Sequence, residues 1–157
     1  MKRTQLLSSL LAGTVLLFSA CSKSETEPTT PVAAKGTFTA MVGSDAFSAP
    51  DAYIMPAAGG TIAVMAKDAS GRSFTIAIFE KDFPVNSPVG VAYSPSISYA
   101  DASSKTYIAS AGTMTITAYG KDASGSVNNL KGKFNITVVN DGAEIAITEG
   151  NFDVNKK

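Results

Sequence analysis

The sequence predicts an all-β domain, either an antiparallel β-sandwich or a small barrel, built from about 8 to 10 short strands. Apolar and polar residues alternate over several short runs, and no window of about 11 or more residues has helical spacing. Turn-forming residues separate these runs. Strict alternation is typical of strands with one buried and one wet face, and such strands belong to antiparallel sheets.

The predicted strands follow one another from residue 37 to residue 147. Each run carries apolar side chains on one face and mostly Thr or Asn on the other, residues that suit a solvated sheet face. The apolar faces are Phe38, Ala40 and Val42, then Ile62, Val64 and Ala66, then Phe74, Ile76 and Ile78, then Met114, Ile116 and Ala118, then Phe134, Ile136 and Val138, then Ile145 and Ile147.

Two kinds of turn separate the strands. Asn140-Asp141-Gly142 lies between two alternating runs and predicts a tight hairpin, because these residues tolerate left-handed backbone conformations. The segment 67–71, Lys-Asp-Ala-Ser-Gly, recurs at 121–125. A duplication, a paired binding loop or a calcium loop are alternatives, but we favour a turn used twice, because Asp bonds to nearby amides and Gly supplies positive φ.

The last strand changes parity. Ile145 and Ile147 share one face, but the apolar pattern resumes at Phe152 and Val154. A slip by one residue moves side chains to the other face unless the backbone absorbs the extra residue. We therefore predict a bulge or bend at residues 148–151, with Gly150 as its centre and Phe152 pointing into the core.

The segment 81–110 is less regular than the rest of the domain. Three prolines interrupt its short apolar runs, and we expect long loops and an edge strand there. Functional loops are commonly displayed in this way on a rigid scaffold. The segment also holds the tyrosines that we predict as a ligand or partner surface, Tyr93, Tyr99 and Tyr107.

The beginning of the chain has the order of a secretory signal. Lys2 and Arg3 precede a short apolar run, Leu6 to Phe18, and then small residues and the only cysteine, Cys21. The run is shorter than the roughly 20 residues that span a bilayer as a helix. Residues 17–21 resemble the bacterial lipobox, in which the cysteine becomes lipidated and the chain is cut before it. We expect a signal peptide at 1–20, a lipidated Cys21 with a flexible tether at 21–35, and one all-β domain at 36–157.

The tether sets the distance between anchor and domain. Residues 22–35 are rich in Ser, Thr, Pro, Glu and Lys and contain little that is large and apolar. As a flexible coil they would span about 20 Å, enough to hold the domain clear of the lipid headgroups. We expect an outer-membrane protein facing the periplasm or the cell surface, whose domain folds without disulfides because no second cysteine exists.

Charge argues against nucleic acid as a partner. Removal of residues 1–20 leaves 11 basic and 13 acidic residues, a formal charge of −2. Nucleic acids and anionic membrane surfaces are usually recognised by clustered Lys and Arg. Lys131 with Lys133 is best explained as a pair on one strand face, and Lys156 with Lys157 as the end of the chain.

The residue types disfavour an enzyme. The chain has no histidine, which excludes Ser/His/Asp and Cys/His catalysis and histidine-ligated metal sites in their usual forms. A Ser/Lys hydrolase stays open as an alternative, with Lys67, Lys105 and Lys121 near several serines. Acidic residues are scattered singly, without the pair that glycoside hydrolysis requires. We expect no catalytic residues, no metal and no cofactor.

The end of the domain resembles a family of small Bacteroidetes-type lipoproteins of unknown function. The resemblance rests on residues 132–137, on Asp141-Gly142 and on residues 145–154, with further agreement at 38–47 and 112–117. It implies an all-β domain on a lipid anchor, and it supplies no reaction and no catalytic residues.

Three functional hypotheses follow from the sequence. The first is a lipid-anchored, non-catalytic binding module whose ligand is a protein or a glycan, or a small apolar molecule if a barrel encloses a cavity. The second is a structural subunit of an envelope assembly that pairs with protein edge to edge. The third is a weak hydrolase that uses Ser and Lys or acids.

Overall fold

The computed structural model describes residues 36–79, 84–91 and 95–157. By its internal contacts the chain divides into two units, Met1–Pro31 and Val32–Lys157, and all the described residues belong to the second. The predicted signal peptide, Cys21 and the tether lie outside the described residues. Within the described ranges, no helix is long and apolar enough to cross a membrane.

The described residues fold almost entirely into strands. A single 3-10 turn, Ala58–Gly60, joins the second strand to the third. The strands are β1 (Gly36–Val42), β2 (Asp45–Ala57), β3 (Thr61–Lys67), β4 (Ser73–Phe79), β5 (Val89–Gly90), β6 (Ser96–Ala100), β7 (Thr106–Lys121), β8 (Val127–Asn140) and β9 (Ala143–Lys156).

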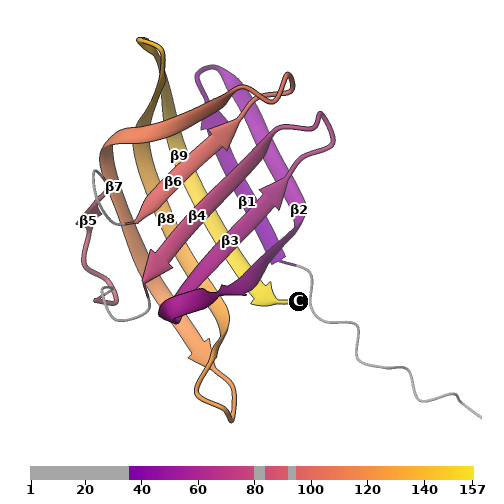
Figure 1. Ribbon diagram of the computed structural model, residues 1–157, viewed down its shortest axis with the longest axis vertical. Helices are drawn as coiled ribbons and strands as arrows, with labels where there is room; N and C mark the ends of the chain where they lie inside the picture. Colours follow the sequence, from indigo (N-terminus) through magenta and orange to yellow (C-terminus); the bar gives the residue numbers. More distant parts are fainter. Residues whose placement is uncertain (1–35, 80–83, 92–94) are drawn as a thin grey trace, which may run out of the picture. The chain divides into compact units, whose positions relative to one another are not determined.

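Eight of these strands close into an antiparallel barrel (Figure 1). The order is β7-β6-β4-β3-β2-β1-β9-β8, and β8 pairs again with β7 to close the ring. β5 is an extra strand of two residues that pairs with β7, and β2 also meets the end of β9 in a short parallel contact. The prediction of a small all-β barrel is confirmed. The edge strand expected within residues 81–110 is β5, which stands at the end of the strand order and pairs with β7 alone, whereas β6 of the same segment pairs with both β4 and β7.

The alternating faces fill the barrel interior. The residues predicted to face the core are buried, with two exceptions: Ile145 is half-buried and Ala118 is exposed. Ala118 departs because the β7–β8 register shifts between Ile116 and Ala118, so a bulge turns Ala118 outward, where it pairs with exposed Lys131. Tyr119 stands out of phase with Ile116 and pairs with buried Leu130, and it is the sequence signal for this shift.

Phenylalanine rings occupy the centre of the interior. Phe38 lies between four other rings, with centroid distances of 5.0 Å to Phe74, 5.5 Å to Phe134, 5.7 Å to Phe47 and 6.2 Å to Phe152. All five side chains are at most 3% exposed. Offset and edge-to-face ring pairs of this kind stabilise a core by about 0.5–1.5 kcal/mol each beyond the burial of their surface.

Two glycines make room for these rings in the β8–β9 ladder. Gly132 pairs with Phe152, and Gly150 pairs with Phe134. A Cβ atom on Gly150 would lie 2.5 Å from the Phe134 ring, and one on Gly132 would collide with the Phe152 ring. Each ring therefore covers the glycine opposite it, an arrangement that overpacking by a single methyl group would disrupt.

The predicted bulge in the last strand is confirmed. Between Ile147 and Gly150, β9 contains one residue more than β8 does between Ile136 and Phe134. Phe152 consequently returns to the core. The residue that takes the positive φ is Glu149, at 53°, whereas Gly150 was predicted as the centre; Gly150 is needed for the space it leaves to Phe134.

The predicted turns are also confirmed. Asp141 and Gly142 have φ of 49° and 79° and form a two-residue hairpin loop between β8 and β9. In the repeated segment, Asp68 Oδ1 accepts hydrogen bonds from the amides of Ser70 and Arg72, as Asp122 Oδ1 does from those of Ser124 and Ser126. The repeat is therefore a turn used twice.

A third loop has the same geometry without the glycine. Asp101 Oδ1 accepts from the amides of Ser103 and Lys105, at 2.9 Å each, and Ser104 takes the positive φ of 67°. The sequence Asp-Ala-Ser at 101–103 repeats that of the other two loops. This loop does not stand out as a repeat in the sequence, because Ser104 takes the place that Gly71 and Gly125 have in the other two loops.

The barrel has two different ends. The proximal end holds Gly36, where the preceding chain joins the barrel, together with the 3-10 turn 58–60, the loop 122–126 and the end of β9 (Figure 1). The distal end holds the β1–β2 turn, the loops 68–72 and 101–105, and the hairpin 141–142. These names are used below.

Candidate functional site

The structure corrects the predicted tyrosine surface. Tyr99 and Tyr107 are only 3% and 8% exposed, and they face each other across β6 and β7 with ring centroids 6.0 Å apart. Tyr99 also packs on Phe74 at 5.1 Å, so both rings belong to the core. Tyr93 lies outside the described residues. The signal for burial was present, because Ile97 and Tyr99 alternate with Ser in a strand pattern.

A polar groove lies on the outside of the barrel instead. It crosses β1, β9, β8 and β7 and has a volume of about 280 Å³. We call it the outer groove. Its lining consists of the outward side chains and the strand backbone between them: Thr37, Thr39, Thr117, Lys131, Gly132, Lys133, Asn151, Phe152 and Asp153.

Strand register places the groove side chains in two rows. Thr37 pairs with Asp153, which pairs with Lys131. In the next outward row, Thr39 pairs with Asn151, which pairs with Lys133. Directly opposed side chains in a sheet lie about 4.5–5.5 Å apart at Cβ. The groove therefore offers hydroxyl, amide, carboxylate and ammonium groups at regular spacing.

A third contribution comes from the bulge in β7. Thr117 sits between the paired residues Ile116 and Ala118, where the register with β8 shifts. The unpaired residue adds a further hydroxyl to the β7 side of the groove. Bulges commonly redirect a side chain in this way.

Two charged side chains of the groove form an ion pair. Lys131 Nζ lies 2.7 Å from Asp153 Oδ2, and Asn129 Nδ2 donates to Asp153 Oδ1 at 3.3 Å. The hydrogen bond from Lys131 lowers the pKa of Asp153; partial burial opposes this, and Asn129 adds to the lowering. Both partners of the ion pair are about half exposed, at 48% and 47%, so it contributes little to stability.

Lys133 differs from Lys131. Within the described part of the chain it takes part in no ion pair, and its side chain is exposed beside Asn151. The side-chain nitrogen of Asn151 donates to the Glu149 carbonyl at 2.8 Å. Among the described residues of the groove, Lys133 is therefore the lysine without an ion-pair partner.

The carboxylate of Asp68 has a structural role. Burial by itself would raise the pKa of Asp68, but hydrogen bonds from Ser70 and Arg72 and the charge of Arg72 outweigh it and lower that pKa. Arg72 also donates to the Ala46 carbonyl at 2.6 Å and lies 5.6 Å from the Phe47 ring. It therefore ties the loop 68–72 to β2 at the distal end.

Several residues considered for catalysis or metal binding contact other groups of the fold. The ammonium groups of Lys105 and Lys121 lie 5.3 and 5.9 Å from the ring centres of Tyr107 and Tyr119. The Ser70 hydroxyl donates to the Asp68 carboxylate rather than to a lysine amine. Among the residues that the structure describes, no group of three or more His, Cys, Asp or Glu could hold a metal ion.

The outer groove was missed by sequence reasoning for a topological reason. The water-facing Thr residues of β1 and β7 were recognised as sheet-compatible, and Lys131 with Lys133 was correctly interpreted as a strand-face pair. Their assembly depends on β1 lying beside β9, although more than 100 residues separate them in sequence. No local pattern specifies that pairing.

Comparisons with protein-family models, with curated proteins and with solved structures find no match to this chain. The resemblance to small lipoproteins stays a prediction.

Asp122 gives a testable dependence of stability on pH. The hydrogen bond from Ser124, against some opposing desolvation, and that from Lys156 lower the pKa of Asp122 to about 2, from 3.8. A lowered pKa stabilises the fold above pH 3.8 and loses that contribution as the pH falls to about 2. We expect Asp122→Asn to unfold at a lower temperature than wild type at pH 6, and the two to converge near pH 2, as measured by circular dichroism. A difference that does not change with pH would contradict this assignment.

Proposed function

We propose that this chain is a lipid-anchored, non-catalytic binding module of the bacterial outer membrane, facing the periplasm or the cell surface, whose ligand lies in the outer groove. The proposed lipid anchor is Cys21. The position of this cysteine, after a short apolar run and small residues, supports the proposal. Anchoring by acyl chains is stable when about two chains enter the bilayer.

One observation carries the choice of the outer groove. The barrel interior contains packed aromatic rings, with Phe38 completely buried among four of them, whereas the groove exposes polar side chains in two rows. Small-ligand sites combine a concave surface with a few convergent polar groups. The interior is less polar, since apart from the phenols of Tyr99 and Tyr107 the described residues include no buried polar or charged side chain.

A glycan is the ligand class that best fits the groove. Sugar hydroxyls both donate and accept hydrogen bonds, and the groove supplies both kinds of partner: the hydroxyls of Thr37 and Thr39, the ammonium of Lys133, the oxygen of Asn151 and the carboxylate of Asp153. Bonds to charged groups are the stronger ones, so Lys133 is expected to contribute most.

The other hypotheses receive less support. Edge-to-edge pairing with a protein needs a free strand edge, and closure of the ring through β7 and β8 gives most strands that the structure describes a partner on both sides. A Ser/Lys hydrolase needs a lysine amine near a serine hydroxyl, whereas Lys105 and Lys121 lie over tyrosine rings. A non-catalytic role agrees better with these contacts.

The anchor is tested by metabolic labelling. Cells that express the chain are grown with an alkyne fatty acid, and the purified protein is coupled to a dye. We expect labelled wild type and unlabelled Cys21→Ala, because no second thiol is present to accept a lipid. Wild-type protein that carries no label would contradict lipid anchoring.

The groove is tested on an array of neutral and acidic oligosaccharides. We expect wild type to bind a subset and Lys133→Glu to lose about tenfold or more in affinity, since a hydrogen bond to a charged group contributes about 1.5–3 kcal/mol. Lys67→Glu is the matched control, because Lys67 is also exposed on a strand but lies outside the groove. Absence of any binding, or equal binding by both variants, would count against the groove.

A further inference from the structure

Exposed apolar side chains gather toward the proximal end of the barrel. Among the described residues, the large apolar side chains that face solvent include Met55 at 46%, Phe79 at 45% and Tyr119 at 46%, each near the proximal end of its strand. Val85 lies in the connection after β4, where the neighbouring Asn86 amide donates to the Ile116 carbonyl of β7. Four of the five exposed large apolar side chains that the structure describes therefore lie toward this end, and the fifth, Ile108 at 50%, lies near the distal start of β7.

Strand pairing places Tyr119 two strands away from Val154, which lies against Gly36, the residue at which the tether joins the barrel. Tyr119 pairs with Leu130, and Leu130 pairs with Val154. Val154 lies directly against Gly36, since a Cβ atom on Gly36 would be 2.8 Å from its Cα. On the other side of the barrel, Phe79 forms the last row with Thr61 and Ala57.

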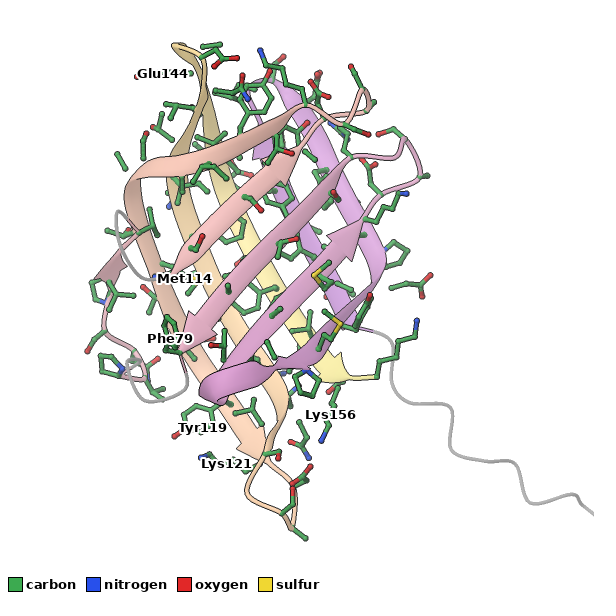
Figure 2. The ribbon with its side chains drawn as sticks, in the orientation of Figure 1. Phe79, Met114, Tyr119, Lys121, Glu144 and Lys156 are labelled. Carbon is green, nitrogen blue, oxygen red and sulfur yellow. The ribbon has the colours of Figure 1, made fainter. Side chains whose placement is uncertain are left out.

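Lysines surround the same end. Figure 2 shows Tyr119, Lys121 and Lys156 toward the end of the barrel opposite Glu144, and Lys121 Nζ lies 5.9 Å from the centre of the Tyr119 ring. Lys157 follows at the end of β9 and lies 4.9 Å from the Tyr53 ring. Lys156 is 3.2 Å from Asp122 and is 35% exposed. Long basic side chains with apolar stems and tyrosine are the residues that suit the boundary between lipid and water.

We propose that this proximal rim, defined by Met55, Phe79, Val85, Tyr119, Lys121 and Lys156, rests on the bilayer that holds the anchor. The inference relies on the proposed lipidation of Cys21, which places the bilayer at the start of the tether. Residues 21–35 are long enough to hold the barrel away from the headgroups or to let it touch them. The length of the tether does not decide between the two, so contact with the bilayer depends on the barrel's own surface.

The occupant is the bilayer rather than a second copy of the chain. The rim lies at the end to which the lipid is attached, so tethering keeps the membrane at a high effective concentration there. Apolar side chains flanked by lysines match the acyl and phosphate layers in turn. Such contact would leave the distal loops turned toward solvent.

The chain contains no tryptophan, which allows a direct test of depth. Phe79→Trp places a single fluorophore on the rim, and Ile108→Trp places one at a residue of similar exposure, 50%, near the distal start of β7. The full lipidated proteins are purified from membranes and reconstituted into vesicles of phosphatidylethanolamine and phosphatidylglycerol, with or without doxyl-labelled phosphatidylcholine. Flotation of the vesicles measures anchoring independently.

We expect both proteins to float with the vesicles, and the doxyl lipid to quench most of the Phe79→Trp emission while that of Ile108→Trp is retained. Flotation with no more quenching of Phe79→Trp than of Ile108→Trp overturns rim contact and leaves the anchor standing. Shielding of Phe79→Trp from aqueous acrylamide without lipid quenching shows that protein covers the rim, and also overturns it. Proteins that do not float overturn both the anchor and the rim contact.

Discussion

The packing of aromatic rings around Phe38 is the interaction on which the rest of this structure depends. Phe38 comes from β1, and its four partners come from β2, β4, β8 and β9, so one cluster joins most of the ring of strands. The cluster fits because Gly132 and Gly150 have no side chains under the rings of Phe152 and Phe134. With a single cysteine placed outside the domain, no disulfide assists this core.

Because aromatic rings pack the described part of the barrel interior, the proposed ligand site is on the outside of the barrel. The outer groove and the proximal rim differ in chemistry although they are close together: the groove row of Thr37, Asp153 and Lys131 neighbours the row of Val154, Leu130 and Tyr119. The groove presents polar side chains in two cross-strand rows, whereas the rim presents apolar side chains between lysines. In the function proposed, the rim and the anchor fix the barrel on the membrane, and the groove holds the ligand.

Local features of the fold were predictable from the sequence, and long-range ones were not. Period-two alternation identified the core faces, and the parity change between Ile147 and Phe152 identified the bulge. Closure of the ring and the groove depend on pairing β1 with β9, which no local pattern encodes. Tyr99 was assigned to a surface because prolines in its segment outweighed its own alternation with Ser. Cys21 stays a prediction, since it lies outside the described residues.

The described interior side chains pack as a core rather than line a ligand cavity. The most direct measurement is the free energy of unfolding of Phe38→Ala, with Phe79→Ala as a matched control at an exposed phenylalanine of the same barrel. A packed ring predicts a loss of about 3–5 kcal/mol for Phe38→Ala and a change within about 0.5 kcal/mol for Phe79→Ala. Equally small changes in both variants would contradict the claim, because a ring that lines an open cavity has few contacts to lose.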